Sequence, residues 1–273
     1  MPYPLLSLEL AREIEIAEAE AAIDCAERMR AASANGGGAV AAVAGGYAIY
    51  CGANSPVTQA VGLGLNGPVG KEEFDKLEKF YFTRNEPVRV ETCPLADQTL
   101  IQHYGERGYH VTEFSNVMVR PVGRGERMAI PDGIQIEKAG SGEMDLWVLT
   151  VAQGFAEHFP VTQELLDIMR MFASGKGTEC YLARIHGKVV GGATVAVRGR
   201  IAGLFGASTL PAFRNRGVQT ALLQTRMRRA AEQGCELAMS LARPGSASQR
   251  NITRQGFQAL YTRVKFERAV GSR

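Results

Sequence analysis

The two halves of this chain end alike, and this internal similarity limits the possible folds more than any other feature of the sequence. Residues 105–120 align with residues 253–268 on the pairs Gly108-Tyr109 and Gly256-Phe257. In both stretches the glycine is placed to end a helix, and the aromatic residue is placed to open a strand. The same order of predicted elements precedes both stretches. The sequence therefore predicts a duplicated α/β unit.

Hydrophobic periodicity predicts the elements of the first half. We expect helices at residues 7–34, 71–84 and 96–107, and strands within residues 39–51, 57–65, 88–93 and 109–119. Ser7 can cap the first helix, and the glycines of Asn35-Gly36-Gly37-Gly38 end it. Residues 121–127, with a proline and two glycines, are the best linker. We therefore expect one domain over residues 1–124 and a second over residues 125–273.

The second half repeats this scheme. We expect strands at residues 134–138, 179–185, 188–197, 201–207, 235–241 and 260–266, and helices near residues 142–155, 162–173, 217–233 and 246–254. His186-Gly187 forms the turn of a hairpin. Each half is thus predicted to be a mixed central sheet flanked by helices, which places the chain in the α/β class.

The charge of the two halves differs in sign. Residues 1–124 carry 11 Lys and Arg against 16 Asp and Glu, whereas the remainder carries 20 against 12. This difference predicts two domains with different partners, the basic one suited to a small polyanion. Nucleic acid is not expected, because the arginines occur singly and without interleaved aromatic residues.

The cysteines and the hydropathy indicate the compartment. Cys25, Cys51, Cys93, Cys180 and Cys235 form no C-x-x-C pair, and no histidine stands at metal-binding distance in the sequence. We expect free thiols in a reducing cytoplasm and no metal site. No apolar run approaches the ~20 residues of a membrane span. The first residues lack the basic stretch of a secretion signal, so no membrane partner is expected.

The strongest chemical signal is Arg214-Asn215-Arg216-Gly217-Val218-Gln219, which joins a predicted strand to a predicted helix. Backbone N–H groups at a helix N-terminus have no partner within the helix, and the helix dipole adds positive potential. Gly217 lets a ligand approach the backbone, and Arg214 and Arg216 add charge. This combination suits a pyrophosphate group. A plain strand–turn–helix connection with solvated arginines has the same spacing.

The loop resembles that of the GNAT superfamily of acetyl-CoA-dependent N-acyltransferases, which runs Arg/Gln-x-x-Gly-x-Gly/Ala. Here the match is Arg214-x-x-Gly217-x-Gln219, and the later Gly-Phe pair of the family is Gly256-Phe257. The resemblance covers about residues 132–268, in element order as well as in motif. It implies that backbone amides of residues 217–221 bind the phosphates of CoA. It also implies that pantetheine pairs along residues 206–209, where a backbone N–H contacts the thioester oxygen.

Three positions depart from the family pattern. Gln219 stands where glycine or alanine is usual, Ile252 replaces a tyrosine that acts as the acid for the thiolate, and Gly245 replaces an asparagine. Polar residues follow Gly245 at a helix start and are taken as substitute CoA contacts, although N-capping is the alternative role of Ser246. The cofactor-binding residues implied are Ala207, Ser208, Thr209, Arg214, Arg216, Gly217, Val218, Gln219, Thr220, Ala221, Ser246, Ser248 and Asn251.

Candidates for catalysis are few. The strand at residues 201–209 carries no carboxylate, although many members of the family place one there. Glu157 and His158 precede Phe159-Pro160 in the region that shapes the acceptor site in this family, and His158 can titrate near neutral pH. A surface Glu-His pair is the alternative interpretation. Tyr261 is a pocket or core aromatic residue and the third candidate. An amine with a lowered pKa needs no base beyond water.

The first half contains a sequence that imitates a dinucleotide-binding motif. Residues 62–67 match G-x-G-x-x-G, with Glu86 and Glu91 downstream. Pro68 removes an N–H, and the next helix begins only near Lys71. The duplication places this stretch where the phosphate loop lies in the second half. We interpret it as an eroded loop that binds no phosphate, and a nicotinamide dinucleotide site is the third hypothesis on function.

The sequence predicts an N-acetyltransferase that moves an acetyl group from acetyl-CoA to a primary amine by direct attack in a ternary complex. The acceptor is a small amine or a peptide, and neither its identity nor the oligomeric state follows from the sequence. The alternative is a non-catalytic acyl-CoA sensor or scaffold, because Ile252 replaces the acid and residues 201–209 lack a carboxylate. The first half is expected to wall off the acceptor site without binding CoA.

Overall fold

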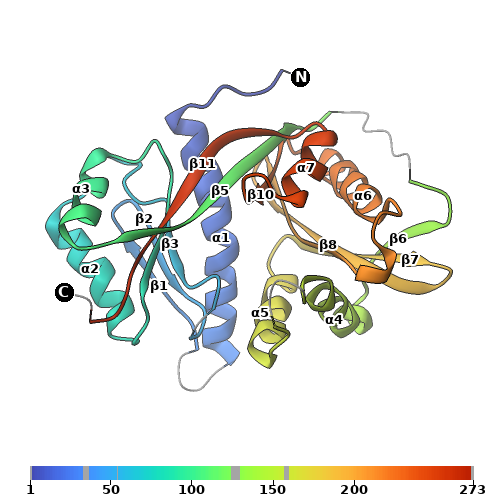
Figure 1. Ribbon diagram of the computed structural model, residues 1–273, viewed down its shortest axis with the longest axis horizontal. Helices are drawn as coiled ribbons and strands as arrows, with labels where there is room; N and C mark the ends of the chain where they lie inside the picture. Colours follow the sequence, from blue (N-terminus) through green and yellow to red (C-terminus); the bar gives the residue numbers. More distant parts are fainter. Residues whose placement is uncertain (1, 33–36, 54, 124–129, 157–159, 272–273) are drawn as a thin grey trace. The chain divides into compact units, whose positions relative to one another are not determined.

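The computed structural model describes residues 2–32, 37–53, 55–123, 130–156 and 160–271, and the chain forms two compact units (Figure 1). The N-terminal unit comprises Leu5–Met118, Leu241–Gln249 and Ala259–Arg273. The C-terminal unit comprises Met1–Pro4, Val119–Ser240 and Arg250–Gln258. The units do not follow chain order, because the last segment of the sequence folds into the N-terminal unit. The boundary predicted between residues 124 and 125 lies outside the described residues.

The strands of the N-terminal unit form a mixed sheet in the order β1-β2-β3-β4-β11-β5. They are β1 (Ala39–Val43), β2 (Gly46–Tyr50), β3 (Gln59–Val61), β4 (Val88–Thr92), β5 (His110–Pro121) and β11 (Gln258–Arg268). β3 and β4 are parallel, whereas β1, β2 and β3 are antiparallel and β11 is antiparallel to β4. β3 is shorter than the strand expected at residues 57–65, because the chain turns at Gly62, whose φ is +74°.

Three helices cover this sheet. They are α1 (Leu8–Ala32), α2 (Lys71–Phe82) and α3 (Gln98–Glu106). α3 begins at Asp97, whose carboxylate accepts a hydrogen bond from the Thr99 amide at 3.0 Å. Phe74 of α2 and Tyr104 of α3 are fully buried and belong to one apolar core with Leu77, Tyr81 and Leu100. All three helices were expected from periodicity, within a few residues at each end.

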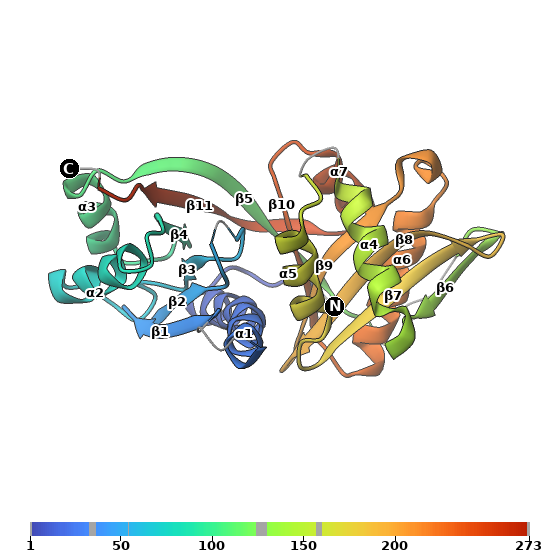
Figure 2. The ribbon, with the colours of Figure 1, turned by 90° about the horizontal axis from the view of Figure 1, so that it is seen from below.

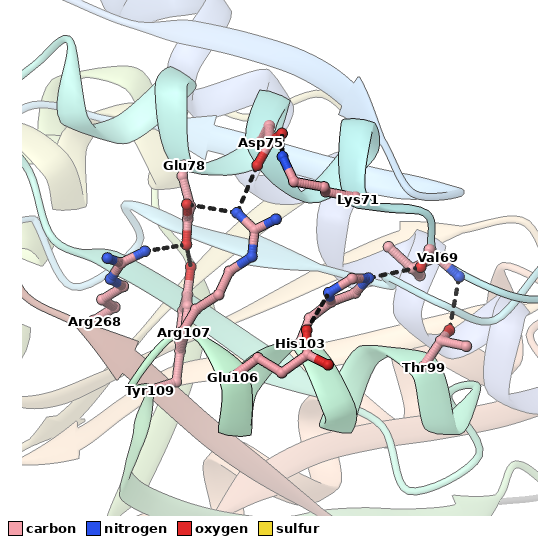
Figure 3. A network of polar contacts seen from close by, with 10 residues as sticks. All are labelled: Val69, Lys71, Asp75, Glu78, Thr99, His103, Glu106, Arg107, Tyr109 and Arg268. Carbon is pink, nitrogen blue, oxygen red and sulfur yellow. Dashed lines mark hydrogen bonds and ion pairs between the residues drawn. The ribbon is translucent and has the colours of Figure 1, made fainter. Parts of the chain in front are cut away.

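Ion pairs hold the end of β11 to the helices of the N-terminal unit (Figure 3). Glu78 of α2 accepts hydrogen bonds from Arg107 at 2.8 Å, from Arg268 at 2.6 Å and from the Tyr109 hydroxyl at 3.3 Å. The guanidinium of Arg107 also lies over the ring of Phe74, 4.9 Å from its centre. Burial and the Glu78 carboxylate raise the pKa of Tyr109. The last strand is therefore fixed by charged side chains as well as by its backbone.

The C-terminal unit contains a second run of strands in the order β10-β9-β8-β7-β6. They are β6 (Ile134–Lys138), β7 (Thr178–Ile185), β8 (Lys188–Arg198), β9 (Ile201–Thr209) and β10 (Leu237–Ala242). β9 and β10 are parallel, and the other neighbouring pairs are antiparallel. The mixed strand directions with helices between them confirm the predicted α/β class.

Helices lie on both faces of these strands (Figure 2). They are α4 (Met144–Phe155), α5 (Gln163–Ala173), α6 (Val218–Glu232) and α7 (Ala247–Arg254). α4 and α6 both pack on β8 and β9, and the two figures place them on opposite faces. Trp147 of α4 is buried in the core below β8, and its indole N–H donates to the Ala193 carbonyl at 3.4 Å. β9 is thus held between two helices, which fixes the segment that leads into α6.

Candidate functional site

The candidate site begins where β9 leaves its parallel neighbour. β9 pairs with β10 only from Ile201 to Gly203, opposite Leu237 to Met239. β9 nevertheless runs on to Thr209, still paired with β8 on its other side. Among the described residues, the second half of β9 therefore has a backbone edge without a partner strand. An extended ligand can pair with such an edge through main-chain hydrogen bonds.

A β-bulge lies in this second half of β9. Ser208 is opposite Gly192, but Phe205 is opposite Thr194, so β9 holds one residue more than β8 over this stretch. Gly206 has a φ of +59°, which favours glycine. A Cβ at Gly206 would also lie 3.3 Å from the Thr194 hydroxyl. The extra residue turns the backbone of Gly206 and Ala207 out of the regular ladder.

The loop after β9 has the geometry of an anion site. Gly217 precedes α6 with a φ of +82°, and a Cβ there would lie 2.8 Å from Cγ of Pro131. Only glycine fits this position. Among the described residues, no hydrogen bond leaves the amides of Val218, Gln219 and Thr220 at the first turn of α6, whereas the Ala221 amide donates to the Gly217 carbonyl at 3.0 Å. Three N–H groups at a helix N-terminus thus remain available to a ligand.

The two arginines of the loop differ in their surroundings. Arg214 donates from Nη2 to the Gly154 carbonyl at 3.1 Å and from Nε to the Thr209 carbonyl at 3.4 Å. It therefore ties the loop to the end of β9 and to the last turn of α4, a role that sequence spacing did not suggest. Arg216 is exposed, and its guanidinium lies 5.4 Å from the ring centre of Phe213. The positive charge of Arg216 is therefore exposed to solvent at the loop surface.

Side chains of the predicted site brace the loop against its neighbours. The Ser208 hydroxyl donates to the Val151 carbonyl at 3.0 Å. The side-chain amide of Gln219 donates from Nε2 to the Thr209 hydroxyl at 2.8 Å, so the residue that departs from the family pattern links α6 to β9. A Cβ at Gly154 would lie 2.2 Å from Oγ of Ser208. Gly154 was not among the predicted site residues, although a lone glycine in a helical pattern indicates close packing.

The predicted residues of α7 have structural partners. The Ser246 hydroxyl accepts a hydrogen bond from the Gln249 amide at 3.1 Å, which is the bond of an N-cap. The Asn251 side chain accepts from Arg254 at 3.1 Å. Ser248 is exposed. The capping role proposed for Ser246 thus has a visible bond, and CoA contacts by these three residues stay predictions.

Of the three candidate catalytic residues, only Tyr261 lies among the described residues. Glu157 and His158 lie outside the described residues. Tyr261 is buried in the N-terminal unit, where its hydroxyl donates to Glu15 of α1 at 2.7 Å. Arg263, fully buried beside it, donates to the same Glu15 oxygen at 2.8 Å. Burial raises the pKa of Tyr261. Its hydroxyl is therefore committed to a buried carboxylate, and a catalytic role would require it to leave that carboxylate.

The counterpart loop of the N-terminal unit, residues 62–70, is closed by its own fold. The Val69 amide donates to the Thr99 hydroxyl at 2.8 Å, and the ring of His103 meets the Val69 carbonyl at 3.0 Å (Figure 3). Arg12 donates to the Leu65 carbonyl at 2.9 and 2.6 Å. The Gly64 amide donates to the Ala44 carbonyl at 2.9 Å. The amides of Val69 and Gly64 are thus donors that a phosphate would need and that the fold already uses, which argues against a dinucleotide site here.

Metal and membrane chemistry find no support in the part of the chain that the structure describes. No group of three or more His, Cys, Asp or Glu side chains is placed to hold a metal ion among these residues. No helix of the described segments is long and apolar enough to cross a membrane. All five cysteines are buried free thiols. Burial raises the pKa of Cys93 and of Cys180 to about 11, so both are protonated at neutral pH.

A split strand with a bulge is followed by a helix N-terminus that begins after a glycine, and this arrangement can accept an extended, phosphate-bearing ligand. The comparisons identify it more closely. Residues 146–257 match the model of the acetyltransferase (GNAT) family. The chain therefore carries a GNAT-superfamily acetyltransferase domain, and that domain contains β9, its bulge and the loop before α6. This finding confirms the resemblance recognised in the sequence.

Solved structures extend the likeness to nearly the whole chain. A GCN5-related N-acetyltransferase from Kribbella flavida is 16% identical, with a TM-score of 0.65 over 91% of this chain and 95% of that chain. A tandem GNAT protein from the clavulanic acid biosynthesis pathway is 12% identical, with a TM-score of 0.62 over 98% of each chain. A functionally unknown conserved protein from Staphylococcus epidermidis is 13% identical, with a TM-score of 0.56 over 73% of this chain and 79% of that chain. No curated protein matches the chain. At these identities the likeness concerns the fold alone.

Proposed function

We propose that the C-terminal unit binds acetyl-CoA and transfers its acetyl group to the primary amine of a small molecule or peptide. The observation that carries the proposal is the continuous path from the unpaired half of β9 to the first turn of α6. Pantetheine amides would pair with the backbone of Ala207–Thr209, and the phosphates would meet the amides of Val218–Thr220. The exposed charge of Arg216 adds attraction for a polyanion. Buried thiols suit a reducing cytoplasm, where we place the protein.

The chemistry we propose is direct attack in a ternary complex. The lone pair of the amine forms a C–N bond with the thioester carbon, the C–S bond breaks, and its electron pair leaves on sulfur. The proton of the new ammonium passes to water or to Glu157 or His158. A backbone N–H of the bulge at Gly206 and Ala207 would face the carbonyl oxygen as charge develops on it. Ser246, Ser248 and Asn251 complete the CoA contacts in this proposal.

Two departures from the family pattern favour a second function. Ile252 stands where the family places its acid, and residues 201–209 carry no carboxylate. Both features suit an acyl-CoA sensor or scaffold that binds the thioester without turning it over. Such a protein would keep every contact described above and lose only the reaction.

Calorimetric titration of the full chain with acetyl-CoA, CoA and NAD tests the proposal first. We expect one equivalent of acetyl-CoA per chain and no NAD binding. Tight NAD binding without acetyl-CoA binding would refute the assignment of the site. Release of CoA thiol in the presence of a panel of aminoglycosides, polyamines, amino acids and peptides then separates enzyme from sensor. Acetyl-CoA binding without thiol release from any amine would favour the sensor.

A further inference from the structure

Among the described residues, the buried cation Arg226 has no acidic partner. It lies on α6 with 3% of its surface exposed. Its Nη1 donates to the Thr194 carbonyl at 3.1 Å and its Nε to the Leu222 carbonyl at 3.2 Å. No carboxylate of the described residues forms an ion pair with it, and its titratable neighbour is Tyr181. Arg263, the other large buried cation, pairs with Glu15 and Glu18.

Packing alone gives no account of this charge. Burying an ion without a counter-ion costs several kcal/mol, and an apolar side chain of similar volume is often neutral or stabilising at such a site. Burial lowers the pKa of Arg226 to about 10, so the guanidinium still carries its charge at neutral pH. The fold thus keeps a positive charge in a low-dielectric region at a cost to its stability.

The charge lies close to the bulge of β9. Thr194, which receives the hydrogen bond from Arg226, is the cross-strand partner of Phe205, the residue before Gly206. Paired residues of antiparallel strands have Cα atoms about 5 Å apart and consecutive Cα atoms about 3.8 Å, so the guanidinium lies within about 10 Å of Phe205 and within about 14 Å of Gly206. The Thr194 hydroxyl itself lies 3.3 Å from the Cβ position at Gly206. No other described side chain brings an unpaired buried cation to this strand.

We propose that Arg226 is an electrostatic positioning residue whose charge stabilises the negative charge that develops on the thioester oxygen and on the departing sulfur at the bulge. This inference rests on the proposed function. In the step concerned, the amine nitrogen bonds to the carbonyl carbon, and the electron pair of the broken C–S bond stays on sulfur as the thiolate. Arg226 lowers the free energy of that thiolate without giving it a proton. It thereby serves in place of the acid whose position Ile252 occupies.

The size of the effect follows from Coulomb's law. Two unit charges about 10 to 14 Å apart at an effective dielectric constant of about 20 shift each other's pKa by about one unit. The thiol of CoA bound to the wild-type chain is therefore expected to have a pKa about one unit below that of CoA bound to Arg226→Met. This quantity needs no acceptor and no turnover.

The experiment titrates the thiolate absorbance of bound CoA between about pH 6 and pH 9, where Arg226 keeps most of its charge. Arg226→Met and Arg226→Gln remove the charge, and Arg226→Lys restores a cation. Arg228→Met is the matched control, because Arg228 lies on the same helix, is exposed and pairs with Glu232 at 3.4 Å. We expect a raised thiol pKa in the first two variants, a partial return with lysine, and no change in the control.

The outcomes are separable. Absence of CoA binding to the wild-type chain would refute the proposed function. CoA binding with one and the same thiol pKa in the wild-type chain, Arg226→Met and Arg226→Gln would overturn the role of Arg226 alone. Thermal unfolding shows whether the variants fold, and we expect melting temperatures equal to or above that of the wild-type chain. Should Arg226→Met not fold, the glutamine variant, which keeps hydrogen-bond donors, decides the question.

Discussion

Two loops occupy corresponding places in the two units, and they differ in what their backbone groups do. The loop after β9 leaves the amides of Val218–Thr220 without partners among the described residues, behind a glycine that no other residue can replace. The loop after β3 uses its amides and carbonyls within its own unit, through Ala44, Thr99, His103 and Arg12. A shared fold therefore does not carry a shared site. The site depends on whether local bonds leave the backbone open.

The largest expected effect comes from reversing the charge of Arg214, which holds the loop after β9 in place. Arg214→Glu removes the hydrogen bonds to the carbonyls of Gly154 and Thr209 and places a negative charge beside those oxygens and the proposed phosphates. We expect acetyl-CoA binding to weaken by about 100-fold or more, because charge-assisted hydrogen bonds are the strong ones. Calorimetry measures the affinity. Arg228→Glu makes the same charge change on the exposed face of α6 and is expected to bind nearly as well as the wild-type chain. Equal affinity in Arg214→Glu and the control would sink the loop assignment.

A matched pair of glycine substitutions compares the two loops directly. Gly217→Ala forces a Cβ to 2.8 Å from Pro131 at a φ of +82°. Gly67→Ala, at a φ of +116°, meets nothing within 4 Å. Backbone strain of this kind costs about 1–3 kcal/mol, so we expect Gly217→Ala to weaken acetyl-CoA binding by about 10-fold or more. We expect Gly67→Ala to leave both affinity and stoichiometry unchanged. Two equivalents of acetyl-CoA per wild-type chain, or equal losses in both variants, would break the comparison.

A smaller effect concerns the bonds that close the loop of the N-terminal unit. Arg12→Met removes the donors to the Leu65 carbonyl, and a lost hydrogen bond from a charged group costs about 1.5–3 kcal/mol. We expect a lower free energy of unfolding with unchanged acetyl-CoA affinity. Chemical denaturation measures the first quantity and calorimetry the second. Arg30→Met, a charge removed near the other end of the same helix, is the control for stability. A second acetyl-CoA equivalent bound by Arg12→Met would mean that the closed loop keeps a latent site.

The sequence was informative where local pattern decides the structure, and silent where tertiary contact does. Periodicity located the helices, and glycine and arginine spacing located the loop at Gly217, because capping and turn chemistry are local. The sequence did not predict that β11 belongs to the N-terminal unit, because pairing between strands that are distant in the chain leaves no local signal. The partner of Arg214, the bulge at Gly206 and the buried charge of Arg226 are also products of packing. The role of Tyr261 stayed open between a pocket and a core residue, because its pairing with Glu15 joins residues from opposite ends of the chain.

The smallest expected effect tests whether the N-terminal unit contributes an acid to the reaction. The Tyr261 hydroxyl is bonded to Glu15, and Ser248 is exposed, so we expect Tyr261→Phe and Ser248→Ala to change the acetyl-transfer rate by less than about threefold. Tyr261→Phe loses about 1 kcal/mol of stability through the missing hydrogen bond, while Arg263 still pairs with Glu15.

The pH profile decides between an acid that has moved and an acid that is absent. Without an acid, the rate rises with pH as the amine deprotonates and then levels off. With an exposed phenol as acid, the rate falls again near the usual phenol pKa of about 10, and with Tyr261 as acid the fall lies at higher pH because burial raises its pKa. We expect a rate that rises with pH and then levels off in the wild-type chain and in both variants. We expect the same profile in Ile252→Tyr if its new hydroxyl points away from the sulfur. A loss of about 100-fold in Tyr261→Phe with unchanged CoA affinity would contradict this expectation and assign the acid to Tyr261.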